Sequence, residues 1–334
     1  MSAGLSLLER LLPDPLMLKI KLLRMVWKYP CHFANYAAAV FDDPLDPEEI
    51  AALKDGLPAE SCTAIDRYLR LHRLTEAKAF DYCTVVDLRT VRGGPDGAFA
   101  LQQRRLKTCL KKFPVLRRYP AELLRETILV HGLALAEPKV LSYIRGRDFV
   151  DAGACRGESS LLMTEFAPRR IYAFEPVPEF RETMRRTIAA SRVDTEIRIC
   201  PEALGATSCE AEFRIDDIGS SLAETGKARP GHAIRVQVRP LDELLAQSHP
   251  DADIGFIKAD IEGAGRAALA GMRETIRRFR PILSIAIYHN KDEFLGVKAD
   301  LAAYFPDYRI RILSLNPMCI ANELYLWAVP AEIV

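Results

Sequence analysis

A glycine-containing turn between an apolar strand and a helix is the first stretch of this sequence that could do chemistry. The strand ends at Asp151, Gly153 and Gly157 follow, and a helix begins at Glu158. Glycine lets a ligand lie against the backbone, because no Cβ stands in the way. The first N–H groups of a helix lack intrahelical partners, and the helix dipole adds positive charge there. The turn therefore predicts a site for a nucleotide or an anionic group.

A carboxylate at the end of the next apolar strand strengthens this prediction. Residues 172–174 lead into Glu175, about 20 residues after the turn, where an acid can accept hydrogen bonds from both hydroxyls of a ribose. An ordinary turn with an exposed acid is the simpler alternative, but the glycine turn and the acid occur together at the expected separation. The dinucleotide fingerprint G-x-G-x-x-G does not fit, because Gly153 stands between two alanines.

From about residue 141 the sequence alternates between strands and helices, which is typical of βαβ units around a parallel sheet. We expect an α/β, Rossmann-like sheet with helices on both faces. Its main strands are expected to end at Asp151 and Glu175 and to cover residues 195–200, 254–258, 281–287, 308–313 and 324–329. Two further segments, 210–215 and 234–238, alternate with period two and predict added, more exposed strands.

Polar residues fall at the ends of these strands: Asp151, Glu175, Glu202, Asp260 and His289. In an open parallel sheet, ligands bind beyond the carboxyl ends of the strands. These side chains should therefore meet at one edge of the sheet, although they are far apart in the sequence. This convergence is the main argument from the residues for an enzyme site.

Asp260, Glu262 and His289 are the catalytic candidates. Asp260 follows an apolar strand, where a carboxylate needs partners, and it could hold a cationic group or take a proton. Glu262 could share either role or satisfy free N–H groups at a helix start. His289 titrates near neutral pH and suits a general base, with a positioning or structural role as the alternative. The three have the ligand types for a divalent ion, but their spacing is not that of a metal site, and no metal is expected.

Four blocks in this order resemble the FkbM family of class I S-adenosyl-L-methionine (SAM) methyltransferases. The blocks are the turn D-x-G-A-x-x-G, the E-P pair at Glu175 and Pro176, residues 256–263 and residues 280–289. The resemblance covers roughly residues 147–329 and implies SAM as the cofactor and an antiparallel last strand. Gly265 departs from the family pattern D-x-E-G-A-E at the place of the last acid, and the effect of this departure stays open.

The resemblance also implies a set of cofactor-binding residues: Asp151, Gly153, Ala154, Gly157, Ser159, Glu175, Pro176, Glu202, Ala203 and Asp260. The two glycines and Ala154 would approach the methionine part of SAM, with Asp151 near its ammonium group or ordering the turn. Glu175 would bind the ribose, and Glu202 and Ala203 would lie near the adenine.

The composition sets the broad class. With 334 residues, of which 49% are hydrophobic and 27% charged, the chain is long enough for one large or two ordinary globular domains. A net charge of +1 gives no argument for nucleic acid as a partner. The 8 cysteines form no C-x-x-C pair, and without a secretory signal they are expected to be reduced thiols of a cytoplasmic protein. No apolar run is long enough to span a bilayer.

Residues 1–140 are expected to form a mostly helical region for substrate selection, docking or oligomerisation, ahead of a SAM-binding domain at 141–334. The stretch 16–29 combines apolar residues with basic ones and has no acid. It could lie on an anionic membrane surface, at the inner membrane face, or on a partner. A helix that docks on the protein's own core or on a second subunit is the simpler interpretation. Basic residues between 104 and 118 could meet an anionic substrate or form a solvated helix face.

Three functions stay open at this point. The favoured one is a SAM-dependent O-methyltransferase acting on a hydroxyl of a sugar, a polysaccharide or another natural product, as the resemblance implies. The second is a nicotinamide-dependent oxidoreductase on a similar sheet, which the missing glycine disfavours. The third is a non-catalytic SAM-binding or scaffold protein of a glycan-assembly complex. The intact turn and Glu175 argue against this third function, whereas Gly265 leaves room for it.

Overall fold

Seven strands form the central sheet, in the order β10-β11-β9-β8-β1-β2-β3. The computed structural model describes residues 45–76, 98–119, 124, 127–215, 220–222, 232–315 and 324–334. The strands of this sheet are β1 (Asp148–Ala152), β2 (Arg170–Phe174), β3 (Glu196–Cys200), β8 (Ile254–Ala259), β9 (Ile282–Ala286), β10 (Tyr308–Ser314) and β11 (Leu324–Pro330). β11 is antiparallel to both β9 and β10, whereas β1, β2, β3, β8 and β9 pair in parallel. The expected Rossmann-like sheet with an antiparallel last strand is confirmed.

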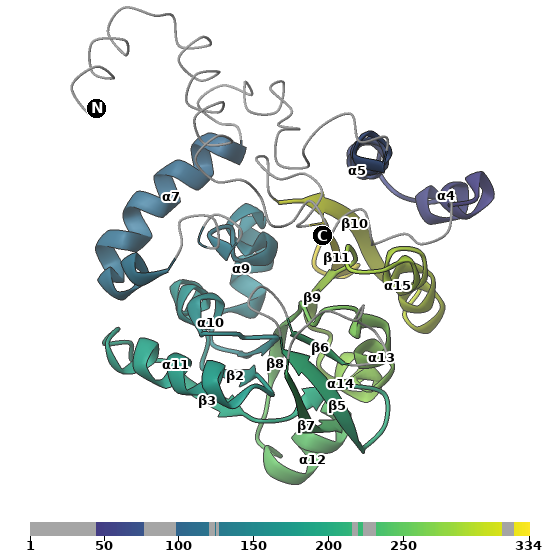
Figure 1. Ribbon diagram of the computed structural model, residues 1–334. Coiled ribbons are helices and arrows are strands. Elements are labelled where there is room, and N and C mark those ends of the chain that lie inside the picture. The colour runs from purple at the N-terminus through teal and green to yellow at the C-terminus, as the bar shows by residue number, and fades with distance from the viewer. Residues whose placement is uncertain are drawn as a thin grey trace, which may run out of the picture.

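Helices cover both faces of this sheet (Figure 1). One face carries α9 (Pro138–Ile144), α10 (Glu158–Met163), which continues into η4 (Thr164–Phe166), and α11 (Pro178–Ala189). The other face carries α13 (Gly265–Ala270), α14 (Arg273–Phe279) and α15 (Lys291–Tyr304), and α12 (Leu241–Ser248) precedes β8. All residues of β1, β8 and β9 are buried, as expected for parallel strands that have helices on both sides.

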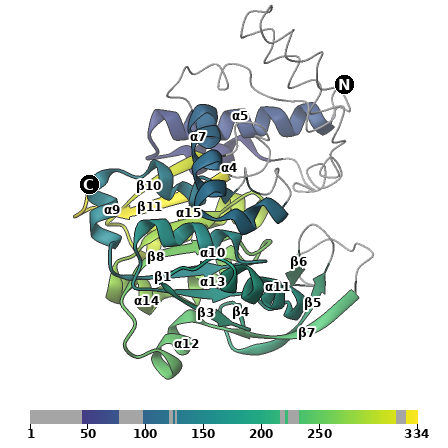
Figure 2. The same cartoon turned by 90° about the vertical axis from the view of Figure 1, so that its left-hand side faces the viewer.

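A second, smaller sheet holds the strands that the period-two pattern predicts as additions. Its order is β4-β7-β5-β6. The strands are β4 (Ala203–Leu204), β5 (Cys209–Ile215), β6 (Ser220–Leu222) and β7 (His232–Arg239). This sheet lies at the end of the molecule away from the N-terminal helix α5 (Ala59–Glu76) (Figures 1 and 2).

Among the described N-terminal helices, α5 packs against β10, which is the edge strand of the sheet, and α4 (Pro47–Lys54) packs against α15. Helix α4 begins with the expected cap: the Asp46 side chain accepts a hydrogen bond from the Glu48 N–H at 2.8 Å, and Glu49 completes a capping box. The Ser61 hydroxyl of α5 accepts a hydrogen bond from the Ile312 N–H of β10 at 2.9 Å. α7 (Ala98–Lys112) and η2 (Pro114–Arg118) follow.

One hydrophobic cluster joins these helices to the sheet. It includes Leu53, Ile65 and Phe113 from the N-terminal region and continues to Val329 in β11. The described N-terminal helices therefore share a core with the rest of the chain. The division of the chain near residue 140 stays a prediction.

The stretch 130–135 departs from the mostly helical pattern expected for residues 1–140. Residues Val130–Leu135 form η3, a 3-10 segment in which His131 and Gly132 have φ values of 49° and 99°. A Cβ at Gly132 would lie 2.9 Å from the Trp327 ring, so the glycine allows a close approach to β11 that a regular helix would prevent.

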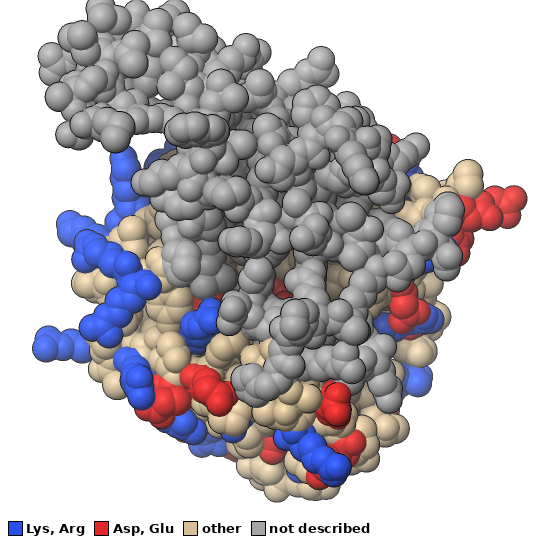
Figure 3. Space-filling model, viewed as in Figure 1, with Lys and Arg blue, Asp and Glu red and all other residues tan. Residues whose placement is uncertain are grey.

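The basic cluster between residues 104 and 118 is largely exposed. Figure 3 shows basic side chains on the side of the molecule where α7 lies in Figure 1. Arg105 is the exception, since its guanidinium donates to Glu165 at 2.7 Å. The stretches 16–29 and 91–97 lie outside the described residues. Among the described helices, none is long and apolar enough to cross a bilayer.

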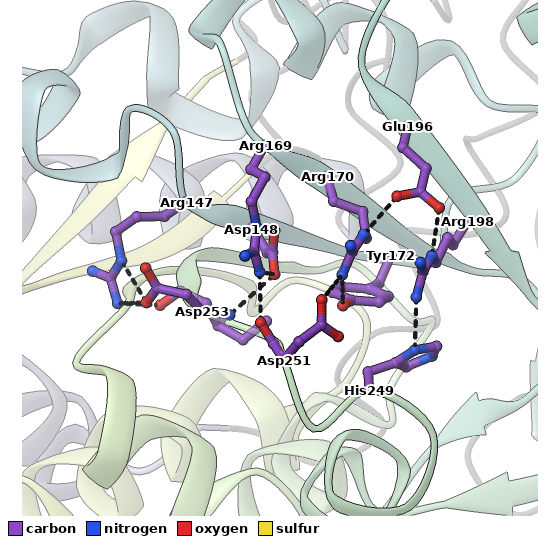
Figure 4. A network of polar contacts seen from close by, with 11 residues as sticks. Arg147, Asp148, Arg169, Arg170, Tyr172, Glu196, Arg198, His249, Asp251 and Asp253 are labelled. Carbon is purple, nitrogen blue, oxygen red and sulfur yellow. Dashed lines mark hydrogen bonds and ion pairs between the residues drawn. The ribbon is translucent and has the colours of Figure 1, made fainter.

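A network of ion pairs lies at the amino edge of the sheet, where the parallel strands begin (Figure 4). Asp148 is fully buried at the start of β1. Its carboxylate accepts bidentate hydrogen bonds from the Arg169 guanidinium and a third hydrogen bond from the Asp253 N–H. Arg170 pairs with both Glu196 and Asp251 at 2.7 and 3.1 Å. In this network each acid faces an arginine, so its charges balance.

Candidate active site

A cleft lies at the carboxyl edge of the sheet, where the parallel strands end. The space within it is about 730 Å³, a figure that includes space open to solvent. The ends of β1, β2 and β8 form one side of the cleft, and β4, β5 and α11 complete it. The predicted site residues that line the cleft are Gly153, Glu175, Pro176, Glu202, Ala203, Asp260 and Glu262.

The other predicted site residues lie behind the wall of this cleft. They are Asp151, Ala154, Gly157, Ser159 and His289. The structure thus brings the strand-end acids together as the sequence predicts, and it divides them into residues that a ligand can touch and residues that support them.

The glycine turn uses its N–H groups within the protein. The N–H groups of Gly153 and Ala154 donate to the Phe174 carbonyl at 3.0 and 3.1 Å, and that of Gly157 donates to the Ala154 carbonyl at 2.8 Å. A Cβ at Gly153, whose φ is +76°, would lie 1.9 Å from the Asp260 carbonyl oxygen. The glycines therefore allow the turn to pack against its neighbours, and these three N–H groups are not free for an anion.

Glu175 braces the same turn from the cleft wall. Its Oε2 accepts from the Cys155 N–H at 2.9 Å and its Oε1 from the Val177 N–H at 2.8 Å. Burial raises the pKa of Glu175 to about 7, although the two N–H groups act in the opposite direction. A carboxylate can accept about four hydrogen bonds, so both oxygens keep capacity for the hydroxyls of a ribose.

Asp151 and Lys258 form a buried pair below the cleft. Lys258 Nζ lies 3.1 Å from Asp151 Oδ1 and donates to the Gly153 carbonyl at 2.6 Å. Ser159 and Ser160 donate to Asp151 Oδ2 at 2.7 and 2.6 Å. Burial works against the charged forms, but the pairing lowers the pKa of Asp151 and raises that of Lys258.

Asp260 is the point where several polar side chains meet. The Tyr325 hydroxyl donates to its Oδ2 at 2.7 Å, the Tyr288 hydroxyl donates to its Oδ1 at 3.3 Å, and His289 Nε2 lies 3.1 Å from Oδ1. Burial alone would raise the pKa of Asp260, but the contact with His289 and the charge of Lys258 hold it well below its usual range. Asp260 is therefore a carboxylate that faces the cleft.

His289 lies between carboxylates on both sides. Its Nδ1 is 2.9 Å from Glu293 Oε2, and its Nε2 also lies 3.8 Å from Glu262 Oε2. Burial lowers the pKa of His289, but the charges of Glu293 and Glu262 and the contact with Asp260 raise it well above the usual value. A protonated ring cannot accept a further proton, so this geometry favours the positioning interpretation of His289 over the general base.

Position 265 has no room for a side chain. A Cβ there would lie 2.7 Å from Glu293 Oε1, and the Gly265 N–H donates to that same oxygen at 2.7 Å. Glu293 lies in the first turn of α15, and its buried carboxylate thus occupies the space that a side chain at position 265 would need.

His131 also reaches this site, and the sequence did not indicate it. Its Nδ1 lies 3.1 Å from the Tyr325 hydroxyl, and its Nε2 has no hydrogen-bond partner among the described residues. Burial lowers the pKa of His131 to about 4, so the ring is neutral at physiological pH. No sequence signal marks this residue, because its position depends on the local backbone of η3.

The arrangement fits SAM. The apolar side chains Leu204 and Phe213 stand beside Glu202 and Ala203, which suits a base such as adenine. Asp260 and Glu262 also line the cleft, and their carboxylates suit the positive charges of a sulfonium and an ammonium group. Among the described residues, no group of three or more His, Cys, Asp and Glu residues could hold a metal ion.

Several solved structures resemble this chain. Methyltransferase FkbM from Methylobacillus flagellatus is 19% identical, covering 80% of this chain and 70% of that one with a TM-score of 0.43. The O-methyltransferase from Bacillus cereus in complex with SAH is 12% identical, covering 69% and 90% with a TM-score of 0.38. Aeropyrum pernix fibrillarin with bound S-adenosyl-L-methionine is 14% identical, covering 62% and 74% with a TM-score of 0.37. None of the curated proteins matches the chain.

The fold is that of the class I methyltransferases, with a mainly parallel seven-stranded sheet, and the cleft lies at the carboxyl edge of this sheet. Residues 151–313 match the family model of the methyltransferase FkbM domain. S-adenosyl-L-methionine is the cofactor that the family implies, as the sequence predicts.

Proposed function

We propose that the protein is an O-methyltransferase that methylates a hydroxyl group of a sugar, a polysaccharide or another natural product. The observation that carries the proposal is the carboxylate of Asp260, which faces the cleft while two tyrosine hydroxyls and His289 hold it in place. A hydroxyl acceptor needs such a group beside it, because its proton has to leave when the oxygen is methylated.

SAM supplies, when bound, a methyl group on a sulfonium that needs no activation. The residues of this chain then have two tasks, which are to align the acceptor oxygen and to receive its proton. The low pKa of Asp260 makes it a weak base toward a free hydroxyl. However, a hydroxyl oxygen becomes strongly acidic as it forms a new bond to carbon, so a carboxylate that stays ionised can take the proton late in the reaction.

Asp260 has two candidate roles, which one pair of measurements separates. In Asp260→Asn, loss of the proton acceptor should lower kcat for methyl transfer from labelled SAM about 10²–10⁴-fold, with little change in affinity for S-adenosylhomocysteine. A large loss of that affinity would instead assign Asp260 to the methionine ammonium group. The matched control is Asp251→Asn at the amino edge, whose side chain is 59% exposed and which should leave transfer unchanged.

The acceptor is found by offering sugars, polysaccharides and natural products with free hydroxyls to the wild-type protein. Transfer to such an acceptor supports the proposal. SAM binding with no transfer to any of them, together with a stable complex through residues 1–140, would favour the scaffold function instead. We place the acceptor's selection in the N-terminal region and the protein in the cytoplasm, with stretch 16–29 as a contact for a membrane, a partner or a second subunit.

A further inference from the structure

The carboxylate of Glu293 is buried without any contact to the cleft. Its side chain is 1% exposed, and the residue does not line the cleft. Burying a charged carboxylate is unfavourable unless it is paired and hydrogen-bonded. An acid in the first turn of a helix is normally exposed and stabilised by the helix dipole, so the helix itself does not require this burial.

The two oxygens of Glu293 have separate partners. Oε1 accepts from the Gly265 N–H at 2.7 Å, which fixes the carboxylate at the start of α13. Oε2 lies 2.9 Å from His289 Nδ1, which therefore donates to it. His289 Nε2 lies 3.1 Å from Asp260 Oδ1 in an arrangement that is not a hydrogen bond, so what acts on Asp260 is the positive charge of a ring that carries protons on both nitrogens.

We propose that Glu293 is a positioning residue, which keeps the His289 ring doubly protonated beside Asp260, so that the positive charge of the ring fixes Asp260 as a carboxylate facing the acceptor. This inference rests on the proposed function for its catalytic meaning. It also explains Gly265, because the carboxylate from α15 occupies the space that a side chain at position 265 would need. Glycine at 265 and glutamate at 293 are then a matched pair.

The groups around His289 come from several elements of the fold. The Tyr288 ring packs against it at an interplanar angle of 35° with centroids 4.2 Å apart, Asp260 and Glu262 face it from the loop after β8, and Glu293 faces it from α15. Lys258, Tyr325 and His131 lie on the far side of Asp260. Glu293 has the shortest of the contacts between His289 and a carboxylate, so its charge should decide the protonation of the ring most directly.

The test variant Glu293→Gln removes the negative charge of the side chain and keeps its size and shape. In Glu293→Gln the amide oxygen can still accept from Gly265, but the amide NH₂ now faces Nδ1 and donates to it. His289 should then be neutral with its proton on Nε2. Nitrogen NMR of the histidine rings at pH 8, with His289 assigned through His289→Gln, should show two protonated nitrogens in the wild type and one in Glu293→Gln.

A matched control stands next to Glu293 in the chain. Asp292 lies in the same first turn of α15, its side chain is 63% exposed, and it pairs with Arg266. Asp292→Asn should leave the nitrogen signals of His289 and the rate of methyl transfer unchanged. A neutral His289 in the wild type, or a doubly protonated ring in Glu293→Gln, would overturn the proposal.

Methyl transfer gives a second readout, which a purely structural role would not produce. Glu293→Gln should lower kcat about 10–100-fold, with the KM for SAM changed less than about threefold. Returning a carboxylate from the other side, in the double variant Gly265→Glu with Glu293→Ala, should recover at least about tenfold over Glu293→Ala alone. Unchanged kcat in Glu293→Gln would contradict the inference.

The two proposals can fail separately. A wild type with the expected NMR pattern but no transfer to any hydroxyl acceptor would overturn the O-methyltransferase proposal and still support control of His289 by Glu293. A wild type that methylates hydroxyls while Glu293→Gln is equally active would support the O-methyltransferase proposal and overturn the proposed positioning role of Glu293.

Discussion

Strand β1 carries a fully buried aspartate at each edge of the sheet, and the two are held in different ways. Asp148, at the amino edge, meets the rigid fork of Arg169, whose side chain is 42% exposed and connects the pair to solvent. Asp151, at the carboxyl edge, meets Lys258, which is as buried as its partner. The Asp148–Arg169 pair belongs to a network of ion pairs that reaches the surface, whereas the Asp151–Lys258 pair is buried beneath the cleft.

The charge balance of the two edges differs as well. At the amino edge each acid has an arginine (Figure 4). At the carboxyl edge the described cations are Lys258, His289, Arg156 and Arg181, and the acids outnumber them: Asp151, Glu158, Glu175, Glu202, Asp260, Glu262 and Glu293. An excess of buried acid lowers stability unless a cation joins it, so this edge is arranged for a positively charged ligand and the other for a stable fold.

The largest expected effect comes from removing Lys258, the buried cation that pairs with Asp151. Lys258→Met should lower the free energy of unfolding by about 3–5 kcal/mol, because Asp151 is left as an uncompensated buried charge. Urea denaturation at pH 8 measures this. The double variant Lys258→Met with Asp151→Asn should recover part of the loss. A loss below about 1 kcal/mol in the single variant would mean that the edge does not depend on the pair.

A smaller effect, with the opposite sign, is expected at Glu158. The residue is 2% exposed, its Oε2 has no hydrogen-bond partner among the described residues, and burial raises its pKa to about 7. The folded-state pKa lies above the ordinary value of 4.5, so the stability that this group contributes is present below pH 4.5 and is lost as pH rises through 7.

Glu158→Gln removes this titration. At pH 8 the variant should be more stable than the wild type by about 1–3 kcal/mol, and near pH 4.5 the two should be similar. Thermal unfolding across this pH range measures the difference. An equal difference at both pH values would show that ionisation of Glu158 is not the cause.

The smallest effect is expected at the amino edge, in Arg169→Lys. The positive charge is kept, but the two-pronged contact with Asp148 is lost, which should cost about 1–2 kcal/mol of stability. Affinity for S-adenosylhomocysteine should not change, because this edge is remote from the cleft. A tenfold loss of affinity would remove the functional distinction between the two edges.

The sequence predicts much of this arrangement, because strand ends are visible in the hydrophobic pattern. Asp151, Glu175, Asp260 and His289 follow apolar strands, and a parallel sheet necessarily brings those ends to one edge. The pairing of Lys258 with an acid also follows from its place in a buried strand.

The residues that hold the site's side chains in place are harder to predict from the sequence. Glu293 looks like an ordinary first-turn acid of a helix, and its spacing of four residues from His289 is the one signal of a contact. Tyr325 lies inside an apolar strand, and His131 lies in a segment whose pattern predicts a regular helix. Their roles depend on tertiary packing, and the pattern of a single segment does not contain that information.

Calorimetric titration with S-adenosylhomocysteine at pH 8, comparing the wild type with Glu175→Ala, tests most directly whether the acidic edge is the cofactor site. Removing Glu175 takes away its hydrogen bonds to the Cys155 and Val177 N–H groups and, under the predicted assignment, the acceptor for the ribose hydroxyls. We expect micromolar binding to the wild type and a loss of roughly tenfold or more in Glu175→Ala, with an intermediate value in Glu175→Gln. Equal affinity in all three proteins, or no binding to the wild type, would contradict the assignment of this cleft.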